Sequence, residues 1–349
     1  MILIVTASFS VASEQSNIYL SSLSKAGELP ISDETTYLVD YNNDITIHTI
    51  LSTQPAMKSI QSQVINFGYV KHSYWFSSSI ENDLSSIQSF LFEVGYPLLD
   101  NIALYLVDPA TNTLLKEYKT GDSLPFDSRP LDQPGFVFPI ELKASEAVRV
   151  LIKVSTQSAM QVPLTLWEPM TFNSSTQAKS LFFGSVMGII AIMALYNLFL
   201  FMSVRDTSYL FFSIFLSGYI IAEAALTGIG YQVFWPALPN WNEIAIIVSA
   251  NTALAALLMF SRQFLSLENS LPRAYKWFKL LALVGFINVA LAFILPYSIT
   301  IIATLAYALI SPLVGYIAGI YLWRTGFKPA RYYTVAFTAF ICAVTVIVL

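Results

Sequence analysis

The chain has 349 residues, of which 55% are hydrophobic and only 11% are charged, whereas roughly 25% of the residues of an ordinary soluble domain are charged. The formal net charge of −4 argues against a nucleic-acid partner, which would require a basic surface. The single cysteine, Cys342, excludes a disulfide within the chain, and the isolated His48 and His72 offer no metal-ligand spacing. We therefore expect a membrane protein that uses no metal and no cofactor.

The N-terminus has the features of a secretory signal. Residues 2–11 are largely apolar, and the small residues at 10–13 would serve as a cleavage site. A positively charged stretch at the start is missing, so a first buried strand is the alternative. We expect residues 1–13 to be a signal peptide, because the chain turns polar immediately afterwards and because the rest of the chain requires an exported N-terminus.

Short strand patterns fill the region from 18 to 170. Runs rich in β-branched and aromatic residues, closed by Asn, Asp, Gly or Pro, are typical of half-buried strands. They lie at 36–40, 45–51, 74–80, 90–94, 102–107, 114–118, 136–142, 148–154 and 162–167, and 56–64 is expected to be a short helix. Many short strands without a long helix between them predict an antiparallel sandwich or jelly roll. A polar linker is expected at 171–179.

Long apolar segments make up the region from 180 to 349. The predicted spans are 181–202, 209–226, 244–260, 280–294, 299–323 and 332–349. The first is uncharged and long enough to cross the roughly 30 Å hydrocarbon core of a bilayer as a helix. Because the last span ends in an apolar run without a flanking anchor, we expect the sequence to be truncated before a seventh span. The predicted fold is a two-part membrane protein, with an all-β jelly-roll-like sandwich followed by a transmembrane helical bundle.

The charges between the spans predict the orientation. Every Lys and Arg after the first span falls in loops on one side, namely Arg205, Arg262, Arg273, Lys276, Lys279, Arg324, Lys328 and Arg331. The opposite loops, 227–243 and 295–298, carry neither residue type. Since cytoplasmic loops are enriched in Lys and Arg, the basic loops are predicted to be cytoplasmic and the β domain to be outside.

Several short motifs, in this order and spacing, carry a resemblance to a known family. In the first half they are Tyr37–Asp40 with the run 45–51, Asn66–Gly68, Tyr74–Phe76, Tyr96–Asp100 with Ala103–Tyr105, Gly121-Asp122, Pro125-Phe126 and Arg129-Pro130. In the second half they are Tyr196–Leu200, Arg205-Asp206, Ser208–Leu210, Gly228–Pro236 and Lys328–Tyr332. The chain resembles bacterial 7TM receptors with diverse intracellular signalling modules, of the kind with a type 2 extracellular domain.

The resemblance implies a receptor in the bacterial inner membrane. Its periplasmic domain, similar to a carbohydrate-binding module, would sense a small extracellular and carbohydrate-like ligand. The helices, embedded in membrane lipid, would pass the signal to a cytoplasmic diguanylate cyclase or histidine kinase that this sequence does not contain. Signalling to such a module favours a homodimer.

Six residues of the β domain are candidates for ligand binding. A sugar-like ligand requires aromatic faces for stacking and polar groups for orientation. The candidates are Trp75, Tyr96, Asp100, Asp122, Phe126 and Arg129. Trp75 lies in the middle of a predicted strand, where an aromatic residue equally serves the core. Arg129 could grip a carboxylate with two hydrogen bonds, or could pair with Asp122 or Asp127 and only order its loop.

Polar residues inside the spans are candidates for signal transmission. They are Asn197, Glu223, Asn251 and Asn288, together with Pro312, which can kink its helix. Polar side chains in spans either serve function or hold helices together. Glu223 lies near the outer end of its span, where water can reach it. Asn197 and Asn251 suit helix–helix contacts.

Three other functions compete with the receptor. A transporter or channel with an extracytoplasmic binding domain is the main alternative, but the spans show no internal repeat and no Lys or Arg. An extracellular glycosidase would need two paired carboxylates among Glu93, Asp100, Asp122, Asp127 and Asp132, and the sequence gives no distance between them. A tethered binding module would need only one span.

Overall fold

The computed structural model describes residues 17–60, 62 and 64–348, and side chains up to residue 339. The predicted signal peptide therefore lies outside the described residues. The chain divides into two compact units. The first, which we call the sandwich unit, takes the chain up to Ala178 together with the segment Tyr231–Pro239. The second, the helical unit, consists of Lys179–Gly230 and Asn240–Leu349.

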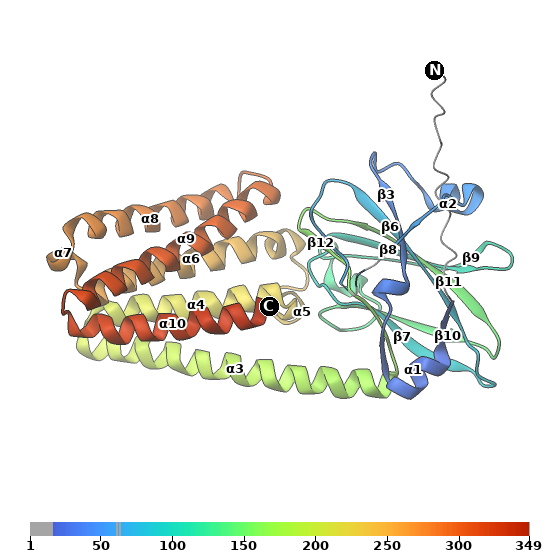
Figure 1. Ribbon diagram of the computed structural model, residues 1–349, viewed down its shortest axis with the longest axis horizontal. Helices are drawn as coiled ribbons and strands as arrows, with labels where there is room; N and C mark the ends of the chain where they lie inside the picture. Colours follow the sequence, from blue (N-terminus) through green and yellow to red (C-terminus); the bar gives the residue numbers. More distant parts are fainter. Residues whose placement is uncertain (1–16, 61, 63, 349) are drawn as a thin grey trace, which may run out of the picture. The chain divides into compact units, whose positions relative to one another are not determined.

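Two main sheets form the sandwich unit (Figure 1). One has the order β4-β3-β6-β11-β8-β9 with β1 beside β6, the other has the order β10-β7-β13-β2, and β12 pairs with β5. All pairings are antiparallel except that of β1 with β6. The strands are β1 (Asn17–Tyr19), β2 (Glu28–Pro30), β3 (Thr36–Asp40), β4 (Lys58–Ser59), β5 (Asn66–Tyr69), β6 (Ser73–Glu81), β7 (Gln88–Val94), β8 (Asn101–Asp108), β9 (Thr113–Thr120), β10 (Phe136–Leu142), β11 (Ala147–Ser155), β12 (Ala159–Gln161) and β13 (Leu164–Trp167).

The strands cross repeatedly from one sheet to the other, as in a jelly roll. The chain passes from β6 to β7 and back to β8, and later from β9 to β10 and back to β11. The core between the sheets contains Phe76, Phe92 and Phe138, all fully buried. Because side chains alternate along a strand, β10 gives this core every second residue from Phe136 to Leu142. The predicted all-β sandwich is therefore confirmed.

Each main sheet also has a covered outer face. On the larger sheet, Trp75, Tyr105 and Leu151 pack beneath the helix α2 (Ile47–Thr53). On the smaller sheet, Trp167 packs edge to face against Phe172, with 5.8 Å between ring centroids. The sandwich unit also contains α1 (Leu20–Ala26) and the 3₁₀ turns η1 (Ser32–Glu34) and η2 (Phe126–Ser128).

Two local predictions in this unit are wrong. The run 45–51 was expected to be a strand, but it enters α2, because Ile47, Ile50 and Leu51 have the i, i+3, i+4 spacing that packs one helix face. The Thr46 hydroxyl caps this helix by accepting from the amide of Thr49 at 3.3 Å. The range 56–64 was expected to be helical, but it contributes β4, which pairs with β3.

The range 171–179, expected to be a polar linker, is also helical. It belongs to α3 (Pro169–Val204), a helix of 36 residues that continues into the first span. Pro169 is the first helical residue, where a missing N–H costs nothing. The Thr171 hydroxyl donates to the Glu168 carboxylate at 2.8 Å, and Ser174 donates to a carbonyl one turn back. Polar side chains that bond locally therefore do not break this helix.

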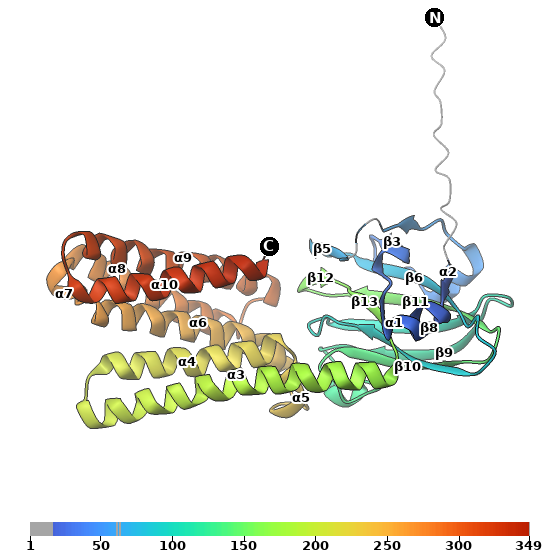
Figure 2. The same cartoon turned by 60° about the horizontal axis from the view of Figure 1, so that its bottom comes forward.

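The helical unit contains long helices that run side by side in both ribbon views (Figures 1 and 2). Within the part of the chain that the structure describes, five helices are long and apolar enough to cross a membrane: α3, α4 (Thr207–Leu226), α6 (Pro239–Phe264), α8 (Pro272–Leu291) and α9 (Tyr297–Arg324). α10 (Lys328–Val348) follows, and the short α5 (Ile229–Val233) and α7 (Leu267–Ser270) connect longer helices. The fourth span was expected at 280–294, but α8 begins earlier, at Pro272. Its first turns are helical, but their basic residues make them too polar to be recognised as part of an apolar span.

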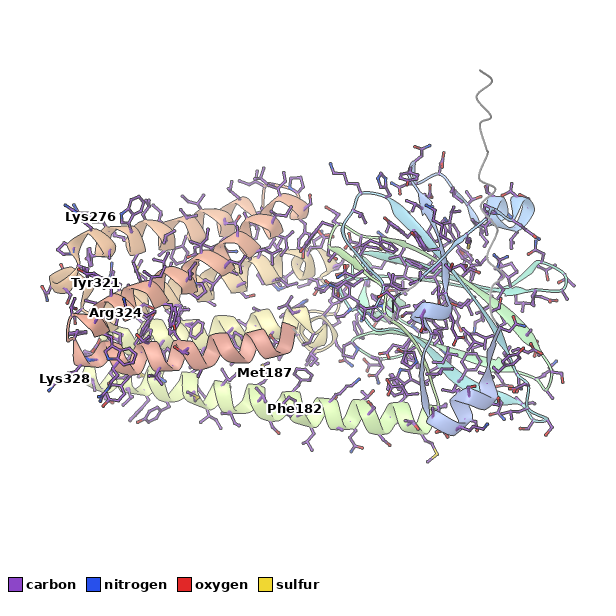
Figure 3. The ribbon with its side chains drawn as sticks, in the orientation of Figure 1. Phe182, Met187, Lys276, Tyr321, Arg324 and Lys328 are labelled. Carbon is purple, nitrogen blue, oxygen red and sulfur yellow. The ribbon has the colours of Figure 1, made fainter. Side chains whose placement is uncertain are left out.

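Basic residues of α8, α9 and α10 lie at one end of the helical unit. Lys276, Arg324 and Lys328 lie together at the end of the helices near α7, whereas Phe182 lies away from that end on α3 (Figure 3). Loops that are distant in sequence are therefore on the same side, as the charge pattern predicts.

Candidate functional site

Five of the six predicted ligand residues come from two neighbouring connections of the sandwich unit. Tyr96 and Asp100 belong to the connection from β7 to β8, and Asp122, Phe126 and Arg129 to the connection from β9 to β10. Both connections lie at the end of the sheet where β8 begins and β9 ends. We call these five residues the polar cluster.

A close backbone contact joins the two connections. The amide of Asp122 donates to the carbonyl of Leu99 at 2.9 Å, and the Ser123 hydroxyl donates to the carbonyl of Asp100 at 2.6 Å. Gly121, with φ +157°, makes this approach possible, since a Cβ there would lie 1.9 Å from the Asp100 carbonyl oxygen. Only glycine fits this close approach, so Gly121 fixes Asp122 beside Asp100.

Asp100 is a buried carboxyl group with several donors around it. Its oxygens accept from the Gln157 amide at 2.7 Å and from the Thr156 hydroxyl at 3.2 Å, and it shares a side-chain hydrogen bond with Asp122. Burial raises the pKa of Asp100, and these hydrogen bonds oppose the shift.

Tyr96 completes the acidic side of the cluster. Its hydroxyl bonds to the side chain of Ser158. Burial is the largest cause that raises the pKa of Tyr96, to about 12, and the nearby Tyr69 and Asp122 add to it. Tyr96 is therefore a neutral hydrogen-bonding group at physiological pH.

Arg129 is a buried cation surrounded by aromatic rings. Its side chain is 6% exposed. The guanidinium carbon lies 4.3 Å from the ring centroid of Phe136, 4.7 Å from that of Phe126 and 5.8 Å from that of Tyr231. Nη1 donates to the carbonyls of Gln133 and Pro134. Burial lowers the pKa of Arg129 to about 10, which leaves the group charged, and the charge of Asp122 opposes the shift.

The segment Tyr231–Pro239 covers the Arg129 side of the cluster, and we call it the docking segment. It belongs to the sandwich unit, although α4 precedes it and α6 follows it in the chain. The Tyr231 ring packs edge to face on Phe126, with 5.7 Å between centroids, and its hydroxyl donates to the carbonyl of Leu124. The sequence alone does not predict these contacts. The only signal was an uncharged, aromatic loop on the side predicted to be extracytoplasmic.

Trp75, the sixth predicted ligand residue, is not in the cluster. It is fully buried on the outer face of the larger sheet, 5.8 Å from the ring of Tyr105, with the ammonium of Lys153 5.5 Å from its centroid. Lys153 in turn pairs with Asp40 at 3.0 Å. These contacts fit a packing role.

In the helical unit, two of the predicted polar residues meet at a buried network. Asn251 of α6 donates to Thr304 of α9 at 2.8 Å, and Asn288 of α8 donates to the same hydroxyl at 2.9 Å. Asn288 also donates to the side-chain oxygen Oδ1 of Asn251 at 3.3 Å. We call Asn251, Asn288 and Thr304 the bundle network. Polar bonds of this kind hold helices together within a membrane.

The other predicted span residues make local contacts. Asn197 donates to the carbonyl of Met193 in its own helix at 2.8 Å. Glu223 is half-buried one turn before the end of α4, and Pro312 lies inside α9, which continues past it as a helix. Among the described residues, no group of three or more His, Cys, Asp and Glu side chains is arranged to hold a metal ion.

The fold, the apolar helices and the charge pattern together define a multi-pass membrane protein with an extracytoplasmic sandwich. Two family models match the chain: "7TMR-DISM extracellular 2" over residues 32–168 and "7TM diverse intracellular signalling" over residues 179–349. The chain belongs to this family of 7TM receptors with diverse intracellular signalling modules and carries the type 2 extracellular domain. A search of curated proteins finds no match.

Proposed function

We propose that the sandwich unit binds a small, carbohydrate-like extracellular ligand at the polar cluster. The supporting observation is that one cluster contains Tyr96, Asp100, Asp122, Phe126 and Arg129. Acidic and basic hydrogen-bonding groups therefore lie beside aromatic rings. A sugar offers hydroxyl groups to carboxylates and tyrosine and an apolar ring face to an aromatic side chain. Loops on a rigid sandwich are the usual place for such a site.

In the proposed pathway, the helices pass the binding signal to a cytoplasmic diguanylate cyclase or histidine kinase, and the receptor is a homodimer in the bacterial inner membrane. Ligand binding shifts an equilibrium between two arrangements that exist without ligand. The family supports this pathway, since its description joins a 7TM unit to intracellular signalling.

A glycosidase is less consistent with the cluster. A retaining enzyme holds its two carboxyl groups about 5–5.5 Å apart, and an inverting enzyme holds them farther apart. Asp100 and Asp122 instead share a hydrogen bond, which leaves no room for a sugar carbon between them. A transporter is disfavoured as well, because the bundle network is bonded within itself.

Thermal unfolding of the full chain in lipid nanodiscs tests the proposal against a panel of neutral and acidic mono- and disaccharides. A ligand that binds only the folded protein raises the unfolding temperature as its concentration rises. Tyr96→Phe and Asp122→Asn should reduce this shift. Tyr41→Phe is the matched control, since Tyr41 is 68% exposed and remote in sequence from the cluster. If no saccharide shifts the wild type, or if the cluster variants respond as the wild type does, the site is not a carbohydrate site.

A further inference from the structure

The docking segment is held to the sandwich by specific polar contacts. The amide of Phe126 donates to the carbonyl of Pro236 at 3.0 Å, and Gln232 donates to the carboxylate of Asp132 at 2.8 Å. With the Tyr231 hydroxyl on Leu124, three residues of the segment bond to the connection between β9 and β10. The segment is therefore seated by both its backbone and its side chains.

Beneath this segment, Arg129 keeps one edge of its guanidinium unused. Nη1 is bonded to two carbonyls, but Nε and Nη2 are buried and have no hydrogen-bond partner among the described residues. These two N–H groups point along the same side of the planar group. That side is the edge that binds a carboxylate through two parallel hydrogen bonds. Buried donors are normally satisfied, so an empty edge of this kind fits an acceptor from a ligand.

The cover over this edge is connected to the spans. Tyr231 is fully buried and forms one of the three rings around Arg129. The other two rings, Phe126 and Phe136, belong to the sandwich itself. Tyr231 lies in the short stretch of chain between α4, which ends at Leu226, and α6, which begins at Pro239.

We propose that the Nε–Nη2 edge of Arg129 is a carboxylate site, closed in this structure by the docking segment, and that a carboxylate ligand binds there by displacing Tyr231. Ligand binding and docking of the segment then exclude each other. The ligand releases the segment, and the release is the first step of transmission to α4 and α6. This inference rests on the proposed function, because it places the ligand in the same cluster, and it narrows the ligand class to sugar acids or other small carboxylates.

Hydrogen exchange of the full chain in nanodiscs tests the competition. The probes are acetate, glucuronate and citrate, with chloride at matched ionic strength and neutral glucose as controls. Carboxylates should accelerate exchange over 121–134 and 231–239, where the Phe126 amide loses its Pro236 acceptor, and the controls should not. Arg129→Gln should abolish this response, whereas Tyr41→Phe should keep it. If no carboxylate changes exchange there, or if Arg129→Gln responds equally, the proposal is overturned.

Cross-linking the docking segment to the sandwich distinguishes failure of this inference from failure of the proposed ligand sensing. In a Cys342→Ser background, Asp132→Cys and Gln232→Cys place two thiols where a 2.8 Å contact now lies, and a short bifunctional thiol reagent joins them. The linked protein should lose carboxylate binding, and the unlinked double variant should retain it. Equal carboxylate binding in both forms would show that the ligand and the docking segment do not compete, but it would not contradict the proposal that the sandwich unit senses a ligand. Absence of binding in both forms, to carboxylates and neutral saccharides alike, removes the sensing proposal as well.

Tyr231→Phe gives a readout without ligand. It keeps the ring over Arg129 but removes the hydrogen bond to Leu124. Because the segment is then held less tightly, exchange over 231–239 should rise several-fold in the absence of any carboxylate, and less carboxylate should be needed to reach full release. Unchanged exchange and an unchanged carboxylate requirement would contradict a docked cover.

Discussion

The polar cluster of the sandwich unit and the bundle network of the helical unit are both buried sets of polar side chains, but they differ in charge. The polar cluster is ionisable and holds Arg129, with two donors that have no partner among the described residues, beside Asp100 and Asp122, whose side chains share a hydrogen bond. The bundle network is neutral, and the amide groups of Asn251 and Asn288 both donate within it.

The difference between these groups follows from their surroundings and points to different roles. A charged group inside a bilayer is expensive, so neutral amides that satisfy one another are suited to joining helices. A cluster in a water-facing sandwich can keep unused donors, because a ligand or water can fill them when its cover moves. This contrast supports the proposed binding role of the polar cluster and a role of the bundle network in joining helices.

The largest loss of stability is expected at Gly121, where the backbones of the two connections that form the polar cluster approach closely. Gly121→Ala should destabilise the sandwich unit by about 3 kcal/mol or more, because the added Cβ would overlap the Asp100 carbonyl. Gly68→Ala is the matched control. Gly68 also has positive φ, at +67°, but nothing lies near its Cβ, so only the conformational cost of roughly 1–2 kcal/mol applies. Chemical unfolding measures both, and equal losses would remove the packing argument.

A smaller loss of stability is expected when Arg129 is replaced by a cation of a different shape. Arg129→Lys should cost about 2 kcal/mol, since an ammonium cannot retain both carbonyl bonds and the flat contact with three rings. The same variant should lose the response to carboxylates. Retained stability together with a retained response would mean that the planar edge has no role.

The bundle network should respond less, and without any effect on ligand binding. Asn251→Ala and Thr304→Val should each cost about 1 kcal/mol, with a coupling energy of roughly 0.5–1.5 kcal/mol between them, as is usual for hydrogen bonds between membrane helices. A double-mutant cycle on unfolding in mixed micelles measures this coupling. Additive effects would show that the 2.8 Å contact contributes nothing to assembly.

The smallest expected effect concerns pH. The pKa of Asp100 is raised on folding, so between its unfolded value, about 3.9, and the higher folded value the native state holds the extra proton. Stability from this group is complete below the unfolded pKa and declines as pH rises through the window. Asp100→Asn lacks this decline, so its stability relative to the wild type should increase with pH. Melting temperatures measured from pH 4 to pH 8 check this; a constant difference would contradict the raised pKa.

Strand prediction succeeded where side chains alternate and failed where they do not. β3 and β10 occupy the expected ranges, 36–40 and 136–142, because one face of each meets the core. The run 45–51 contains β-branched residues, yet it enters a helix, since Ile47, Ile50 and Leu51 cover the outer face of the larger sheet. Tertiary packing overrode the local preference there.

Five of the six sandwich candidates meet, because they are loop residues that flank neighbouring strands, and the motif Gly121-Asp122 holds two of them together. Trp75 lies outside the polar cluster because successive residues of a strand point to opposite faces of the sheet. Phe76 therefore packs in the core between the sheets, and Trp75 packs on the outer face of the larger sheet.

The sequence by itself determined the two-part organisation, the positions of most spans and the side on which the basic loops lie. These are local properties of composition and charge, which each segment carries without reference to the others. Only the tertiary structure decided that Tyr231 lies against Phe126 and that Gln232 reaches Asp132, 100 residues earlier in the chain. Such contacts depend on where the whole fold brings two loops, and no periodic pattern within either loop records the partner.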